Sequence, residues 1–157
     1  MSSFPITPEG LERMRAEVHN LKANDRLKIS KEIGAAIELG DLSENFEYHS
    51  AKDRQGMIEA KIRDLEAKIS RAQVIDISKL SGERVVFGAT VTLDDVESGE
   101  QQTYQITGEY EADVESGRIS IVSPVARALI GKEVGDEVKI PGKAGQRTVE
   151  ISKVEFK

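Results

Sequence analysis

Three carboxylates lie close together in the segment 40–48, at Asp41, Glu44 and Glu47. The chain has no cysteine, which excludes disulfides and thiolate metal ligands, and the one histidine in this segment's vicinity is His49. Two carboxylates cannot enclose a magnesium ion, but they can add one or two ligands to an ion that already holds waters and phosphates. Asp41 and Glu44 are therefore the candidate catalytic and metal-binding residues, and the chemistry they suit is Mg²⁺-dependent phosphodiester hydrolysis completed by a partner.

The same two acids also have a purely structural interpretation. Asp41 could be the N-cap of a helix with Glu44 at its third position, which is a common capping box. The interpretations are compatible, since capping would fix the geometry of the carboxylates. The segment also holds more polar side chains than a turn needs, which favours a contact surface. These candidate contacts are Ser43, Asn45 and Tyr48. Lys52 lies behind them on the helix, where a contact to phosphate and a solvated helix face fit equally well.

Two long amphipathic helices must hold this segment between them. Thr7 and Pro8 are typical of a helix start, and Gly40 of a helix end. The apolar seam of the first helix is expected to contain Leu11, Met14, Val18 and Leu21 and, after a shift of phase, Ile29, Ile33 and Ile37. The second helix is expected over residues 43–74, with a coiled-coil period. Because the connection is short, the helices should form an antiparallel rod about 45 Å long.

The pattern changes from helical to β near residues 76–82. Alternating apolar residues and turn signals then predict short strands, with one helix among them. The strands are expected at 84–93, 101–107, 118–122, 137–140 and 147–156, and the helix at 123–131. The predicted fold class is therefore α+β, with an antiparallel two-helix coiled coil over 1–78 and an antiparallel-sheet domain with one short helix over 79–157.

The charge balance narrows the range of partners. The net charge is −6, divided as −1 over residues 1–80 and −5 over residues 81–157. This argues against broad, nonspecific nucleic-acid binding and makes the second half a candidate for docking on a protein. The N-terminus has no secretory pattern and no apolar stretch approaches the length of a membrane span. A cytoplasmic monomer without membrane contact is expected.

Four segments, in order along the chain, closely resemble the Gre family of bacterial transcript cleavage factors. They are Gly40–Asn45 with Glu47–His49, Ala72–Asp76, Phe87–Val91 and Ser123–Lys132. The resemblance covers essentially the whole chain. It implies that the sheet domain has an FKBP-like fold and docks on bacterial RNA polymerase at the mouth of its secondary channel.

The resemblance also implies how the chain acts. The coiled coil would enter the channel, and Asp41 and Glu44 would help to hold a Mg²⁺ that the free protein binds poorly and shares with the polymerase. The 3′ end of backtracked RNA would lie against the tip. The polymerase then hydrolyses this RNA and rescues the arrested complex, so the chain is an elongation factor without an active site of its own. The residues expected to dock on the polymerase are Ser123, Pro124, Ala126, Arg127, Leu129, Ile130 and Gly131.

Two positions depart from the family pattern. Ile37 stands where many relatives carry arginine, which weakens the family's basic patch, although Lys52 keeps a basic residue at a matching position. Phe46 stands where alanine is usual, and its sequence context allows either an apolar contact in the channel or packing on the tip.

Three other functions fit parts of the pattern. An inhibitor of the same shape is disfavoured because the pair Asp41 and Glu44 is retained. A regulator of nucleoside diphosphate kinase is disfavoured because those relatives have much shorter helices. A prolyl isomerase is disfavoured because such pockets contain several aromatic residues, including a tryptophan, which this chain lacks. A chaperone-like grip by the coiled coil stays open as a side activity.

Overall fold

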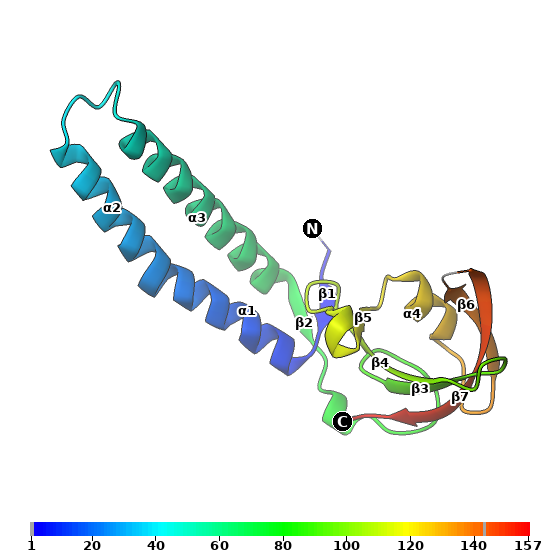
Figure 1. Cartoon of the computed structure of the whole chain (residues 1–157). Helices are drawn as coiled ribbons and strands as arrows, with labels where there is room; N and C mark the ends of the chain where they lie inside the picture. The colour runs from blue at the N-terminus through cyan, green and yellow to red at the C-terminus, as the bar shows by residue number, and fades with distance from the viewer. Residues whose placement is uncertain (1, 143) are drawn as a thin grey trace. The chain divides into compact units, whose positions relative to one another are not determined.

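The computed structural model describes residues 2–142 and 144–157, and the chain divides into two compact units (Figure 1). One unit, Leu11–Arg71, is a helical hairpin, and the other combines Met1–Gly10 with Ala72–Lys157. This division differs from the expected boundary at residue 78, because β1 (Phe4–Ile6) and β2 (Ala72–Val74) pair in parallel with each other. The α+β class, with a helical hairpin and a sheet domain, is confirmed.

The first arm of the hairpin contains a π-helical turn that explains the shift in its seam. α1 (Pro8–Asn20) runs through η1 (Leu21–Asp25) into α2 (Arg26–Glu38). A π turn takes up one residue more than an α turn, so the buried positions after it move one place along the chain. The seam therefore continues at Ala36, which is 4% exposed, whereas the predicted seam residue Ile37 is 47% exposed.

The second arm is α3 (Phe46–Arg71), which runs antiparallel to α2 (Figure 1). It begins three residues later and ends three residues earlier than the predicted helix 43–74. The early end follows from pairing, because Ala72–Val74 forms β2 instead. Ala51, Ile62 and Leu65 are the buried residues of α3.

Ion pairs connect the two arms of the hairpin. Arg26 donates two hydrogen bonds to Glu59, at 2.8 and 3.0 Å, and these bonds hold the pKa of Glu59 below its usual range. Both side chains remain partly exposed, so the pair contributes little to stability by itself and chiefly fixes register. The other ion pairs between the arms are Lys22–Glu66, Lys61–Glu17 and Arg54–Glu32.

The sheet domain has one five-stranded sheet in the order β5-β4-β3-β7-β6. Its strands are β3 (Thr90–Asp95), β4 (Gln101–Thr107), β5 (Arg118–Ser120), β6 (Glu137–Gly142) and β7 (Gly145–Glu155). The sheet is antiparallel as expected except at one edge, where β4 and β5 pair in parallel. Short 3₁₀ turns η2 (Ile77–Lys79) and η3 (Val114–Ser116) and the helix α4 (Pro124–Leu129) complete the unit.

A buried carboxylate ties the N-terminal segment to this domain. Glu111 is 7% exposed and accepts hydrogen bonds from the backbone N–H groups of Thr7 and Gly108, both at 2.9 Å, and from the Thr7 hydroxyl. The Thr7 hydroxyl oxygen in turn accepts a hydrogen bond from the N–H of Gly10 at 3.1 Å, as expected of an N-cap. Glu111 thus serves the fold by satisfying buried backbone donors.

Candidate functional site

The connection between α2 and α3 reverses direction through two left-handed residues. Gly40 has a φ of 79° and Asp41 a φ of 43°, and Asp41 is the one non-glycine residue with positive φ in the described part of the chain. Asp is one of the few side chains that tolerate this region. The N–H of Gly40 donates to the Ile37 carbonyl at 3.1 Å, which closes the end of α2. The turn therefore presents Asp41 immediately after the helix end.

Asn45, and not Asp41, caps α3. The Asn45 side-chain oxygen accepts a hydrogen bond from the N–H of Tyr48 at 3.0 Å, and its amide nitrogen donates to the carbonyls of Ala36 (2.6 Å) and Gly40 (3.3 Å). The capping box considered for Asp41 and Glu44 is therefore wrong, because the helix begins after Asn45. The structure gives Asn45, expected to contact RNA, a structural role in the turn.

Asp41 and Glu44 are both exposed and line one hollow of about 460 Å³, called here the acidic hollow. The remaining residues of the acidic hollow are Leu39, Gly40, Asn45, Phe46 and Glu47. The Ser43 hydroxyl donates to one carboxylate oxygen of Asp41 at 3.0 Å, which orients that carboxylate.

This donor set fits a shared magnesium ion. Carboxylate oxygens are suitable ligands for Mg²⁺, and an open hollow leaves room for waters and phosphate oxygens. Among residues 2–142 and 144–157, no group of three or more His, Cys, Asp and Glu side chains could hold a metal ion. Two carboxylates in one hollow could supply part of a coordination shell that a partner completes.

The other tip residues expected to contact RNA make different contacts in the structure. Tyr48 is half-buried, and its ring meets the ring of His49 edge-on at a centroid distance of 5.4 Å. Lys52 is exposed and donates a hydrogen bond to Gln55 at 3.2 Å, and it lies outside the acidic hollow. Of the expected contacts, Ser43 is the one hydrogen-bonded directly to a candidate metal ligand.

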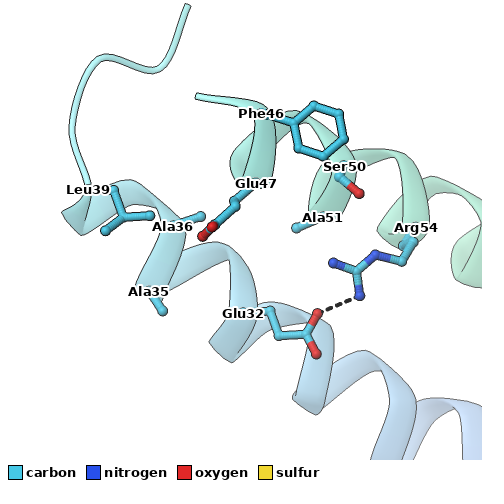
Figure 2. A pocket seen from close by; sticks show the side chains of 9 residues that line it. All are labelled: Glu32, Ala35, Ala36, Leu39, Phe46, Glu47, Ser50, Ala51 and Arg54. Carbon is cyan, nitrogen blue, oxygen red and sulfur yellow. Dashed lines mark hydrogen bonds and ion pairs between the residues drawn. The ribbon is translucent and has the colours of Figure 1, made fainter. Parts of the chain in front are cut away.

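A second hollow of about 540 Å³ adjoins the first, between α2 and α3, and is called here the tip groove (Figure 2). Arg54 reaches across it and pairs with Glu32 at 2.6 Å. Its other lining residues are Ala35, Ala36, Leu39, Phe46, Glu47, Ser50 and Ala51. No pattern used above predicted this groove, although the small residues on both facing helices are a signal for it.

The expected docking segment divides into core and surface residues. Ala126 and Leu129 are fully buried, so their assignment as docking residues is wrong. They pack in the sheet-domain core because α4 presents this face to the sheet. Ser123 caps α4 by accepting a hydrogen bond from the N–H of Ala126 at 3.3 Å. The exposed members of the segment are Pro124, Arg127, Ile130 and Gly131.

Two family models together match nearly the whole chain. The model described as "Transcription elongation factor, N-terminal" matches residues 4–74. The model described as "Transcription elongation factor, GreA/GreB, C-term" matches residues 80–156. No helix in the described residues is long and apolar enough to cross a membrane.

Curated relatives are similar over their full length. Transcription elongation factor GreA of Rhodospirillum rubrum is 51% identical over 156 residues, which cover 99% of each chain. The factor of the same name from Hyphomonas neptunium is 52% identical over 157 residues, which cover 100% of each chain. Among solved structures, GreA factor homolog 1 (Gfh1) of Thermus thermophilus is 28% identical, covers 98% of this chain and 99% of its own, and gives a TM-score of 0.44. On the family models and these full-length identities, the chain belongs to the GreA/GreB family of transcription elongation factors.

Proposed function

We propose that the chain stimulates the hydrolysis of backtracked RNA by bacterial RNA polymerase, with the helical hairpin in the secondary channel and the acidic hollow at the active centre. The observation that supports this proposal is that the side chains of Asp41 and Glu44 are exposed and that neither caps α3. Both are exposed in one hollow, while Asn45 supplies the cap of α3. Acids that the fold does not use for capping remain available to a ligand.

The residues of the turn have separate roles, in metal binding, in orienting a ligand and in holding the turn. Asp41 and Glu44 supply oxygen ligands, and the hydroxyl of Ser43 orients the Asp41 carboxylate. Asn45 holds the turn in place through its bonds to Ala36 and Tyr48. A Mg²⁺ shared with the polymerase would supply charge neutralisation and activation of water. The chain itself is not a nuclease, because two exposed acids provide neither a complete metal site nor a positioned base.

The sheet domain is the part that docks on the polymerase. Its half of the sequence carries most of the net negative charge, −5 of −6, which favours a protein partner over a nucleic-acid backbone. The exposed residues Pro124, Arg127, Ile130 and Gly131 form the proposed contact. A monomer acting in the cytoplasm satisfies this arrangement, because one hairpin enters one channel.

The decisive experiment adds the full-length protein to a stalled, backtracked polymerase complex with Mg²⁺ and follows the length of the RNA. We expect the transcript to shorten from its 3′ end faster than in polymerase alone and to become extendable again. Free RNA mixed with the purified protein and Mg²⁺ should stay intact. Unchanged RNA length in the complex would refute the proposal, and hydrolysis of free RNA would make the chain an enzyme in its own right.

A further inference from the structure

The tip groove and the acidic hollow share a wall, because Phe46 lines both of them. We propose that the tip groove binds the base of the 3′-terminal nucleotide of backtracked RNA, with that base stacked on Phe46. The proposal rests on the proposed function, since the acidic hollow must lie at the phosphodiester for the neighbouring base to reach the groove. It assigns the RNA a contact on this chain besides the carboxylates.

Phe46 contributes its aromatic ring to the surface. Its exposed fraction of 82% is the greatest among the large apolar side chains of the described residues. Of the two outcomes that the sequence left open, packing on the tip is therefore wrong. An exposed aromatic ring beside a candidate RNA site offers a stacking face, and such stacking tolerates every base because each base has a π-face.

The shape of the groove suits a flat ring. Ala35 and Ala36 on α2 and Ser50 and Ala51 on α3 line it with small side chains (Figure 2). Its volume of about 540 Å³ lies within the range of about 300–1,000 Å³ typical of small-molecule sites. The hollow is therefore large enough to take a planar group against these small side chains.

The charges along the groove favour a base over a phosphate. Arg54, the basic residue that lines it, is already paired with Glu32 at 2.6 Å. Glu47 adds a carboxylate, which would repel a phosphate but can accept a hydrogen bond from the exocyclic amino group of a base. An apolar side chain of the polymerase is the competing occupant of this space, and a transcript without its 3′-terminal base distinguishes it from the RNA.

The test compares two transcripts in otherwise identical backtracked polymerase complexes. One carries a normal base at its 3′-terminal nucleotide, and the other is abasic there. Cleavage rates are measured with limiting amounts of full-length wild-type protein and of Phe46→Ala. We expect Phe46→Ala to lower the rate about 5- to 150-fold on the normal transcript and to leave the rate on the abasic transcript unchanged. Phe46→Tyr, which keeps the ring, should retain most of the activity.

A matched control is Met57→Ala, because Met57 is 71% exposed on the same helix and lies outside both hollows. It should change neither rate. Equal losses on both transcripts with Phe46→Ala would show a contact with the polymerase, and no loss on either would show no contact at all. Both outcomes overturn the proposal. If the wild-type protein stimulates cleavage of neither transcript, the proposed function itself fails, and the base contact fails with it.

A second measurement does not depend on cleavage. A transcript ending in 5-iodouridine is irradiated in the complex with Asp41→Asn protein, in which the RNA should remain uncut. We expect a crosslink between the RNA end and this chain that disappears when Phe46→Ala is added to the same protein. A crosslink of equal yield without the aromatic ring would place the base elsewhere.

Discussion

The tip and the sheet domain use their carboxylates in opposite ways. Asp41 and Glu44 at the tip are exposed, and neither caps α3, since Asn45 does so. Glu111 in the sheet domain is buried and accepts hydrogen bonds from two backbone N–H groups and a hydroxyl. A carboxylate that satisfies buried donors belongs to the fold, whereas carboxylates left in solvent are available to a ligand. The hydrogen bonds thus separate a carboxylate that the fold already uses from the carboxylates that are open to the proposed metal ion.

The largest effect expected from this contrast is on the activity of Asp41→Asn. Asn keeps the shape, accepts the hydrogen bond from Ser43 and tolerates the left-handed backbone of this position, but it lacks the negative charge. We expect stimulated RNA cleavage to fall about 100-fold or more, which corresponds to about 3 kcal/mol. Thermal unfolding should hardly change.

The control for this prediction is Glu38→Gln, which removes an exposed carboxylate near the tip but outside the acidic hollow. It should leave the cleavage rate and polymerase binding unchanged. If Asp41→Asn stimulates cleavage at the wild-type rate, Asp41 is not a metal ligand. The exposed acids at the tip would then have no function that distinguishes them from other surface acids.

Glu111→Ala should lower the stability of the sheet domain, whereas Asp41→Asn should lower activity and leave stability unchanged. Its removal leaves the N–H groups of Thr7 and Gly108 buried without this acceptor. We expect a loss of about 2–4 kcal/mol in the free energy of unfolding of the sheet domain, because each unsatisfied buried donor costs about 1–3 kcal/mol. Urea denaturation followed by circular dichroism measures this loss. Glu109→Ala, an exposed acid in the same loop, should be nearly neutral, and equal stability of the two variants would contradict the role of Glu111.

The sequence predicted the elements on either side of the tip better than the tip itself. The apolar periods and the caps at Thr7 and Ser123 located the helices, because these signals are local. The start of α3 was misplaced because Asp41 and Asn45 are equally good N-cap residues by type. The choice between them depends on the carbonyls of Ala36 and Gly40, which bind the Asn45 amide only after the chain has turned.

The same limit explains other differences between sequence and structure. Ile37 fits the seam by residue type, but the π turn at Leu21–Asp25 rotates Ala36 into that position. The tie between Glu111 and Thr7 joins positions 104 residues apart, and no local pattern connects them. The shared hollow of Asp41 and Glu44 could be expected from their local spacing, whereas the tip groove could not, because two helices form it.

Two glycine-to-alanine substitutions, one beside Glu111 and one in the hairpin, should change stability in opposite directions and by smaller amounts. A Cβ at Gly10 would clash with a carboxylate oxygen of Glu111, whereas a Cβ at Gly34 in the hairpin would meet nothing within 4 Å. Both glycines lie in helices, where alanine is intrinsically better by about 0.5–1 kcal/mol. Gly34→Ala should therefore raise the midpoint of unfolding, and Gly10→Ala should lower it by displacing the carboxylate. An increase for both variants would mean that the Glu111 carboxylate can move without cost.

The smallest expected effect concerns Asp95, a partly buried carboxylate that accepts hydrogen bonds within a turn. The backbone N–H groups of Ser98 (3.1 Å) and Glu97 (2.9 Å) donate hydrogen bonds to it, and these bonds, with the nearby charge of Arg147, hold the pKa of Asp95 below its usual range. A depressed pKa in the folded state means that the ionised form contributes stability at neutral pH. This contribution is lost as the pH falls through the lowered pKa of the folded state.

Asp95→Asn should therefore be less stable than the wild type at neutral pH. The difference in their unfolding midpoints should shrink as the pH falls below about 4, where the unfolded carboxyl becomes protonated. The matched control is Asp53→Asn, an exposed helical acid for which the structure shows no such donors among the described hydrogen bonds. The measurement is the unfolding midpoint of each variant and of the wild type, followed from neutral to acid pH. A difference for Asp95→Asn that stays constant with pH would come from the shape of the turn and not from the charge of the Asp95 carboxylate.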